Sequence, residues 1–383
     1  MPFNPGFNKS EAEPLIALLS NLEGAPSPPF QQLALPIGWK ILFDSQSIGP
    51  FNNRWQLAQS PAGQYAVLIR GTVYQTGSII DDLLSVLIKA NGSMGAFNYE
   101  FAAANATTYF PGAGVHLGFA LAALIMLYYP ADLTGILWQL PLMVPQNSDV
   151  FIAGHSQGAA IATLCTSFLN YPANLQPIVN NLGLNYNYNY KTYVFAQPRP
   201  GNDAYGNDYD SIVSNNGMAF TVNNSQDWVP QVPLTFELLD DVNTPNPISV
   251  WTEKESFVHK TILKIVGHTV EGLKADMAVS QVAKHLPNIQ ALNGILNDSH
   301  VRKALFGDQA PGPLASLDAS SVLSLLVPSL NFTACGSPYI LTGVHGVNPC
   351  DANKQPWERD FFWQHHLTMY YDLLQGISIP TTC

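Results

Sequence analysis

Charge is what this sequence has least of. Only 11% of its 383 residues are Asp, Glu, Lys or Arg, against about 25% in an average globular chain. The 16 basic residues are outnumbered by 27 acidic ones, for a net charge of −11, and they form no cluster. Because nucleic acids and anionic membranes are bound through clustered Lys and Arg, the composition argues against both as partners. A neutral or apolar substrate suits such a chain better.

Long hydrophobic runs and metal-ligand motifs are also missing. The longest apolar stretch, residues 118–145, is broken by Pro130 and Asp132, and its uninterrupted part is short for a bilayer. We therefore expect a buried helix there and no transmembrane segment. Neither H-E-x-x-H nor C-x-x-C occurs, so the sequence indicates no metal site. What is abundant is apolar residues, at 47%, enough for a sizeable core.

Cysteine is scarce as well. The four cysteines are Cys165, Cys335, Cys350 and Cys383. Their even count permits two disulfides, and a Cys335–Cys350 bridge would close a short loop, but four reduced thiols are an equally open alternative. Glycosylation sequons occur, for example at Asn105 and Asn331, yet an Asn-rich chain produces them by chance. Residues 1–15 show neither a basic start nor an apolar segment. A mature secreted form is favoured over a cytoplasmic protein, and the oligomeric state stays open.

Short β-branched or apolar runs alternate along the chain with helical patterns. This alternation predicts an α/β fold with a mostly parallel central sheet flanked by helices. We expect strands at 64–72, 148–154, 191–198, 218–224 and 334–343. We expect helices at 115–129, 159–170 and 361–376.

The pattern changes after Pro233. Residues 252–306 carry apolar side chains at helical spacing. We therefore expect residues 236–330 to form a helical cap, inserted into a single domain that spans residues 1–383. An ordinary elaboration with no role at a site is the alternative.

A G-x-S-x-G motif, made by Gly154, Ser156 and Gly158, lies between the strand expected at 148–154 and the helix expected at 159–170. A sharp turn from strand to helix strains the residue at the corner, and glycines two residues away avoid collisions between the flanking segments. The motif in this context predicts a nucleophile elbow. The amide of Gln157, at the helix N-terminus, would be placed to stabilise an oxyanion. A structural turn that merely contains a serine is the alternative.

A serine hydroxyl becomes a good nucleophile only when a base removes its proton and a third group orients that base. In sheets of this kind the partners follow in the order serine, acid, histidine. Asp227 comes directly after the strand expected at 218–224, which makes it the best-placed acid. Asp203, Asp208 and Asp210 lie in a polar segment that resembles solvated surface.

Seven histidines follow Asp227 in the sequence. They are His259, His268, His285, His300, His345, His365 and His366. The first four fall in the expected cap, and His345 lies between two glycines in an expected loop. His365 and His366 enter the C-terminal helix, where the last connection delivers its residue. Adjacent residues project in different directions, so only one of this pair is expected to reach Ser156.

A second oxyanion donor should follow an earlier strand. The strand expected at 64–72 ends in Arg70, Gly71 and Thr72. Gly71 allows a close approach of the backbone, and Thr72 can offer both its amide and its hydroxyl. A simple turn is the alternative.

Six stretches occur in the order typical of one family. They are LIRGT (68–72), VHLGF (115–119), GHSQGAA (154–160), FAQPRPGN (195–202), NNSQDWVPQVP (223–233) and HHLTMYYDLL (365–374). Together they resemble the class 3 lipase family of α/β-hydrolases. The resemblance covers roughly residues 60–235 and 331–375.

This resemblance implies an α/β-hydrolase fold with Ser156 as nucleophile and Asp227 as orienting acid. It implies Thr72 and Gln157 as oxyanion donors, with no cofactor. Relatives often show His followed by Leu, with Tyr about one turn later, which favours His366 over His365 as the base. One departure is Gln157, where the family commonly has Leu.

Relatives also carry a small helical lid after the RGT segment, which corresponds here to residues 73–90. Its apolar face would consist of Ile79, Ile80, Leu83, Leu84 and Leu87. These residues suit a protein core equally well.

The function that follows is a serine carboxylic-ester hydrolase, in first place a triacylglycerol lipase that acts through an acyl-enzyme and meets its ester or lipid substrate at a lipid–water interface. A short-chain, feruloyl or phospholipid esterase would use the same residues. A hydrolase-fold lipid-binding protein without catalysis is the alternative of another class.

Overall fold

The computed structural model describes a mixed α/β protein. The described residues are 3–48, 52–71, 87–94, 97–107, 112–128, 134–233, 243, 324–327, 329, 331–355 and 358–383. The lid expected at 73–90 and the cap expected at 236–330 thus lie almost wholly outside the described residues.

The centre of the molecule is a seven-stranded sheet with the order β1-β2-β3-β8-β9-β10-β11. The strands are β1 (Lys40–Asp44), β2 (Arg54–Gln59), β3 (Tyr65–Arg70), β8 (Asp149–His155), β9 (Asn189–Phe195), β10 (Ala219–Asn224) and β11 (Ser337–Leu341). The pairs β1–β2 and β2–β3 are antiparallel, and every later pair is parallel. The expected mostly parallel sheet is confirmed, with each of the five predicted strands in it.

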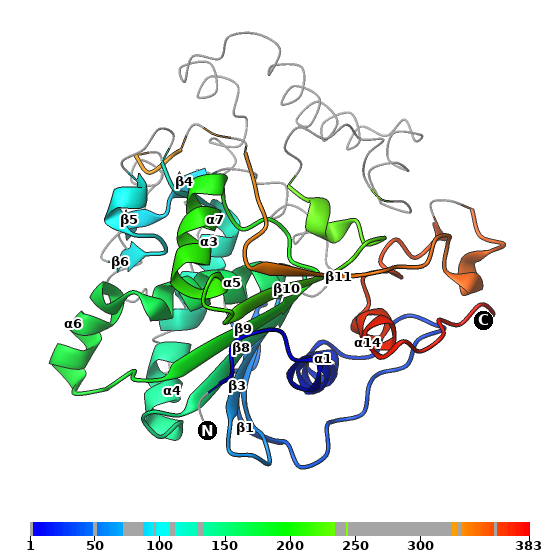
Figure 1. The fold of residues 1–383 in the computed structure, drawn as a ribbon, viewed down its shortest axis with the longest axis horizontal. Coiled ribbons are helices and arrows are strands. Elements are labelled where there is room, and N and C mark those ends of the chain that lie inside the picture. The colour runs from blue at the N-terminus through cyan, green and yellow to red at the C-terminus, as the bar shows by residue number, and fades with distance from the viewer. Residues whose placement is uncertain are drawn as a thin grey trace, which may run out of the picture.

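Helices cover both faces of this sheet (Figure 1). On one face lie α1 (Lys9–Glu23) and α14 (Leu367–Gln375), which pack against each other. On the other lie α3 (Leu117–Tyr128), α4 (Ile136–Met143) and α5 (Gln157–Asn170). Two segments far apart in the sequence, α1 and α14, therefore lie side by side on one face of the sheet.

The central strand β8 is buried along its whole length, as expected for a parallel strand covered on both faces. Its side chains alternate between the two faces, with period two. Phe151 and Ala153 belong to the core beneath α1 and α14, whereas Val150 and Ile152 belong to the core beneath α3 and α5. By the same alternation the next residue, Gly154, faces α5, and His155 faces α1.

Smaller elements surround the sheet. They are β4 (Leu87–Lys89), β5 (Asn91–Met94), β6 (Phe97–Glu100), η1 (Ala104–Thr107), β7 (Gly114–His116), α6 (Pro172–Leu182), α7 (Asp203–Tyr209), η2 (Asp210–Ser214), η3 (Val229–Gln231) and η7 (Pro349–Asp351). The strand β4 pairs with β7 and contains Leu87, the one residue of the expected lid face that is described; it is buried against Val327 and Phe332.

Two expected helices are shorter than the sequence pattern indicates. The helix expected at 115–129 begins at Leu117, because residues 114–116 pair with β4 as a strand. The helix expected at 361–376 begins at Leu367, with His366 at its N-cap and turns before it. Both histidines therefore lie just before the C-terminal helix and not within it.

Neither expected state of the cysteines is correct. One disulfide joins Cys350 to Cys383, and Cys165 and Cys335 are buried free thiols. Cys335 cannot reach Cys350 because it is enclosed beside α7, where its amide donates to the side chain of Gln197. The bridge ties the C-terminal residues to the segment that precedes α14.

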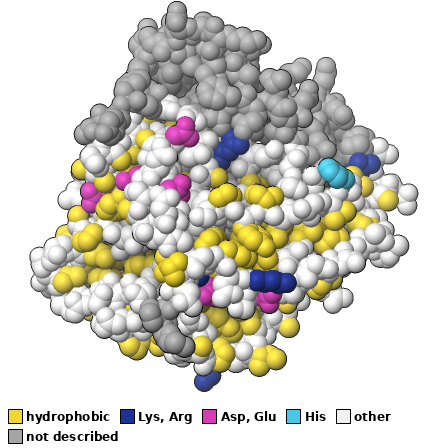
Figure 2. Space-filling view, viewed as in Figure 1, with side chains coloured by type: hydrophobic (Ala, Val, Ile, Leu, Met, Phe, Trp, Pro, Cys, Tyr) yellow, Lys and Arg dark blue, Asp and Glu magenta, His cyan; other side chains and the backbone are white. Residues whose placement is uncertain are grey.

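The surface reflects the composition. Figure 2 shows few charged side chains on this face of the molecule, with hydrophobic ones spread between them. Among the described residues, no helix combines the length and the apolar character needed to cross a membrane.

Candidate active site

Ser156 occupies a sharp turn between β8 and α5. Its φ and ψ angles are 57° and −134°, a combination that is costly for a residue with a side chain and is typical of strained functional turns. The Ser156 amide donates to the Phe195 carbonyl at the end of β9. The turn is thus anchored to the neighbouring strand while the serine side chain stays partly exposed.

The two glycines of the motif are required because a side chain at either position would collide with neighbouring backbone atoms. A Cβ atom on Gly154 would lie 2.2 Å from the carbonyl oxygen of Gly158. One on Gly158 would lie 2.3 Å from the carbonyl oxygen of Ile69 in β3. Real Cβ atoms do not approach so closely, so the strand and the helix can meet at this angle only with glycine at both positions.

The end of β3 lies against the start of α5. A Cβ atom on Gly71 would lie 2.7 Å from Cβ of Gln157 and 2.8 Å from the amide nitrogen of Gly158. Gln157 is the first residue of α5, and its side chain is buried. The expected oxyanion donor Thr72 lies outside the described residues, although its neighbour Gly71 contacts the elbow.

Asp227 is buried just beyond the end of β10. One carboxylate oxygen, Oδ2, is 2.7 Å from Nδ1 of His365 and accepts a hydrogen bond of 2.8 Å from the Tyr370 hydroxyl. The other, Oδ1, accepts from the amide of Val229 at 3.0 Å. Burial by itself would raise the pKa of Asp227, but its interaction with His365 and the hydrogen bonds from Val229 and Tyr370 hold that pKa below its ordinary value. Asp227 is therefore a carboxylate at neutral pH.

The other acidic candidates have different partners. Asp203 accepts a hydrogen bond from Asn331, and Asp208 accepts one from Tyr171. Asp210 accepts one from the amide of Gly336. The expected solvated segment is instead helical: Asp203 is exposed on α7, whereas Asp208 of α7 and Asp210 of η2 are partly buried. None of the three is hydrogen-bonded to His365.

His365 is fully buried and donates its Nδ1 proton to Asp227, which leaves Nε2 as the unprotonated nitrogen of the neutral ring. Nε2 forms no hydrogen bond with any described residue, and it is not hydrogen-bonded to the hydroxyl of Ser156. Burial lowers the pKa of His365, against the opposing effect of Asp227. The ring is held in the tautomer that a general base needs.

The preference for His366 is not supported by these contacts. Nε2 of His366 lies 2.9 Å from Asp360, so this ring is directed away from Asp227. The reason is local: His366 is the N-cap of α14, whereas His365 belongs to the turn before it. The remaining candidate, His345, is exposed, and the four histidines of the expected cap lie outside the described residues.

Two further residues, which were not expected from the sequence, lie beside the Asp227–His365 pair. His155 precedes Ser156, and its Nδ1 is 2.8 Å from a carboxylate oxygen of Glu23. Its Nε2 is 2.8 Å from the backbone carbonyl of His365, and the two imidazole centres are 4.4 Å apart. The chain neighbour of Ser156 thus contacts His365. A signal for Glu23 existed, because an acidic residue at the C-terminal end of a helix opposes the helix dipole.

The one described residue at the beginning of the expected cap lies close to the site. The side chain of Asn243 donates to the backbone carbonyls of Ser225 and Asp227. At the other end, Leu326 forms a bridge with Ile88 of β4. The helical cap expected at 236–330 stays a prediction.

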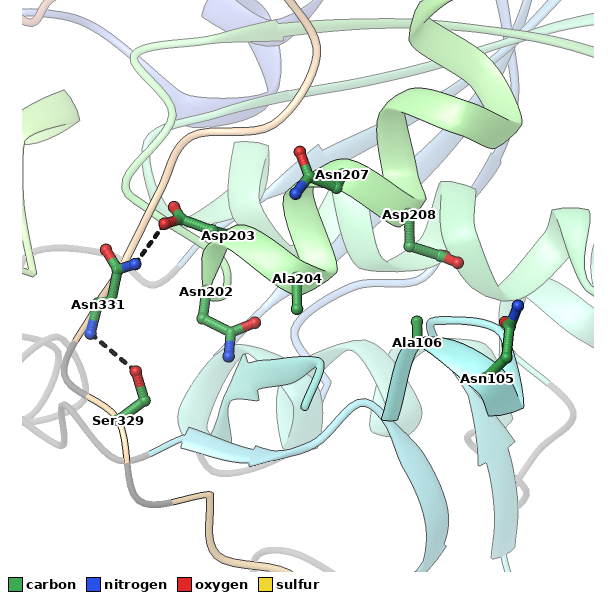
Figure 3. A pocket seen from close by; sticks show the side chains of 9 residues that line it. All are labelled: Asn105, Ala106, Asn202, Asp203, Ala204, Asn207, Asp208, Ser329 and Asn331. Atoms are coloured by element: carbon green, nitrogen blue, oxygen red, sulfur yellow. Dashed lines mark hydrogen bonds between the residues drawn. The ribbon is translucent and has the colours of Figure 1, made fainter. Parts of the chain in front are cut away.

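A pocket of about 530 Å³ lies elsewhere, between α7, η1 and residues 329–331. Figure 3 shows its amide and carboxylate side chains, with Asn331 bonded to both Asp203 and Ser329. It shares no residue with the group around Ser156. Within the described ranges, no cluster of three or more His, Cys, Asp or Glu could hold a metal ion.

The family comparison joins these observations. Residues 66–237 match the family described as Lipase (class 3), and this segment contains the elbow and Asp227. Residues 66–237 of the chain belong to the class 3 lipase family. His365 lies beyond the matched segment, so its part in this lipase-family site rests on the contact with Asp227.

Curated relatives of this lipase-family chain align over short stretches. Lipase ZK262.3 of Caenorhabditis elegans is 34% identical over 88 residues, which are 23% of this chain and 21% of the relative. The secreted mono- and diacylglycerol lipase LIP4 of Malassezia restricta is 35% identical over 83 residues, 22% of this chain and 23% of the relative. The chain thus matches less than a quarter of the length of these relatives.

Solved structures of lipases align more broadly but at lower identity. The alignment with the M37 lipase covers 88% of this chain and 79% of that lipase, with 16% identity and a TM-score of 0.47. The Lip2 lipase of Yarrowia lipolytica covers 60% and 76%, with 21% identity and a TM-score of 0.41. The strand order and the matched segment, rather than these alignments, identify the fold of the lipase-family chain.

Proposed function

We propose that this member of the class 3 lipase family is a serine carboxylic-ester hydrolase with the triad Ser156, His365 and Asp227. The observation that carries the proposal is the buried Asp227–His365 pair, in contact with the residue next to a strained serine. Nδ1 of His365 is already bonded to a carboxylate, and Nε2 is left to accept a proton.

The reaction would follow from this arrangement. Ser156 Oγ attacks the ester carbonyl while Nε2 of His365 takes its proton, and the backbone amide of Gln157 stabilises the oxyanion together with Thr72. The proton then passes from His365 to the departing alcohol. A water molecule, activated by the same nitrogen, releases the acid from Ser156. Asp227 holds the tautomer and stabilises the imidazolium that forms in each step.

For the substrate we propose a lipid ester, in first place a triacylglycerol. The sparse charge of the chain and the lipase names of its relatives favour this choice. Short-chain, feruloyl and phospholipid esters stay as alternatives within the same chemistry, and a lipid-binding protein without catalysis is the alternative from another class. The Cys350–Cys383 disulfide favours a secreted protein, since disulfides persist in oxidising compartments.

The first test is hydrolysis of p-nitrophenyl esters from acetate to palmitate, with and without an emulsified interface, by the wild type and by Ser156→Ala. We expect the variant to lose activity by a factor on the order of 10⁴ or more, with an unchanged unfolding midpoint. Ser211→Ala is the matched control, since this exposed serine only donates to the carbonyl of Asp208, at the end of the preceding helix α7.

The outcomes separate the candidates. Long-chain activity that rises at the interface indicates a lipase, and short-chain activity alone indicates an esterase. Activity retained in Ser156→Ala would refute the triad. Absence of turnover in the wild type, together with no labelling of Ser156 by a fluorophosphonate, would favour the binding protein.

A further inference from the structure

The protonation state of His155 follows from its two hydrogen bonds. Nε2 faces the backbone carbonyl of His365 at 2.8 Å, and a carbonyl oxygen can only accept. Nδ1 faces an oxygen of Glu23 at 2.8 Å, and a carboxylate also only accepts. Both contacts are satisfied together when the ring carries a proton on each nitrogen. The geometry therefore describes a His155 imidazolium paired with a Glu23 carboxylate.

This pair is built into the fold. Phe151, Ala153 and His155 occupy alternate positions of β8, so their side chains lie on the same face of the sheet. This face is covered by α1, and His155 is therefore directed toward that helix. Glu23 is the last residue of α1, and that last turn contains no basic residue. A carboxylate there opposes the helix dipole. An acidic residue in this unfavourable position indicates an interaction that compensates for it, and the ion pair with His155 is that interaction.

We propose that Glu23 keeps His155 doubly protonated and that this cation positions His365 as a neutral base. The His155 cation packs against the imidazole of His365 and donates a hydrogen bond to its backbone carbonyl. The proposal rests on the ester hydrolase function proposed above. Glu23 and His155 are positioning residues in it, since neither is assigned a contact with the substrate.

Charged and titratable groups from every packed element bear on this arrangement. Asp227 faces His365 from beyond β10, and Tyr370 of α14 lies near His155 while its hydroxyl bonds Asp227. Arg70 of β3 is the register partner of His155, and its guanidinium donates to the carbonyl of Asn52 and interacts electrostatically with Glu23. Without the Glu23 charge, Arg70 would oppose a second cation at His155.

The electrostatic directions agree with the geometry. Burial works to lower the pKa of His155, but the charge and hydrogen bond of Glu23 raise it above the ordinary value. Burial lowers the pKa of His365, and the His155 cation lowers it further, whereas Asp227 and the more distant Glu23 raise it. A base must be unprotonated to act, so a lowered pKa extends activity toward acid pH.

The decisive variant is Glu23→Gln, examined by the pH dependence of kcat/KM on a soluble short-chain ester. Loss of the carboxylate removes the second proton of His155, and the neutral His155 no longer opposes protonation of His365. We expect the acid limb to move to higher pH by about one unit, so that at a pH below both limbs kcat/KM falls about tenfold. Glu23→Asp should restore part of the shift.

Glu13→Gln is the matched control, because Glu13 lies on the same helix and pairs only with the exposed Lys9 among the described residues. It should leave the pH profile unchanged. An acid limb of Glu23→Gln that stays in place, or moves to lower pH, would overturn the proposal, since a merely structural role would change kcat without moving the limb.

A second measurement does not depend on turnover. Imidazole ¹⁵N chemical shifts of His155 in the Ser156→Ala protein should show two protonated nitrogens at neutral pH, and one after Glu23→Gln is added. A neutral His155 beside Glu23 would refute the pair whatever the enzyme activity. A charged His155 in a protein that hydrolyses no ester would instead uphold the pair and refute the hydrolase function.

Discussion

At the scale of single residues, the choice between two adjacent histidines shows where sequence reasoning stops. The composition of the site was predictable: Ser156 and Asp227 each stand at the end of a buried strand, and the histidines follow near the C-terminus. The choice between His365 and His366 was not, because it depends on which residue becomes the N-cap of α14. A shift of one residue in the start of α14 would decide which imidazole contacts Asp227.

This choice gives a direct prediction for two alanine variants. His365→Ala should lower kcat/KM on a soluble ester by a factor on the order of 10⁴ or more, because it removes the proposed base. His366→Ala should retain most of the activity, since its partner is Asp360 and not Asp227. Steady-state kinetics on both proteins, with thermal unfolding as a check on folding, would decide. The reverse order of activities would restore His366 as the base.

At the scale of elements, the turn between β8 and α5 was predictable because its constraint is local. Gly154 and Gly158 are two residues from the serine, and the apolar strand and Ala-rich helix beside them are visible in the sequence. The contact between Glu23 and His155 could not be predicted, because it is not local in the sequence. Its partners are 132 residues apart, and no local pattern brings the end of α1 to the end of β8.

The close approach at the elbow predicts the effect of Gly158→Ala. The new methyl group would meet the carbonyl of Ile69 and the amide of Gly71, so β3 and α5 must separate. We expect a loss of about 3 kcal/mol in the free energy of unfolding, together with most of the esterase activity, because Ser156 and Gly71 move apart. Urea unfolding and ester hydrolysis measure the two effects.

Gly183→Ala is the control for this prediction. Gly183 has a positive φ of 66° but open space around its Cβ position, so it should cost only about 1 to 2 kcal/mol and leave activity intact. Equal losses of activity in both variants would mean that backbone strain in general, and not contact at the elbow, limits the enzyme.

At the scale of the whole molecule, the order of strands and helices was predictable because alternating patterns identify α/β chains. The cysteine pairing was not, because four cysteines carry no local rule that selects partners. Cys350 and Cys383 meet only because α14 returns the C-terminal residues past the segment before it. Cys335, which is nearer to Cys350 in the sequence, is enclosed beside α7.

The disulfide predicts a redox-dependent stability. It closes a loop of 33 residues, for which chain entropy gives a stabilisation of about 3 to 4 kcal/mol. We expect reductant to lower the free energy of unfolding of the wild type by this amount in a denaturant titration. The double variant Cys350→Ser/Cys383→Ser should start at the lower value and not respond to reductant. A similar response in both proteins would place the effect at the buried thiols of Cys165 and Cys335 instead.

The packing of α1 against α14 also has a consequence for the order in which the site is completed during synthesis. The ribosome makes Glu23 first, then Ser156 and Asp227, and His365 last of these four residues. A nascent chain that has already folded around β8 therefore holds the proposed nucleophile without its proposed base. We expect such a chain to be unable to cleave an ester until α14 has emerged and docked beside α1.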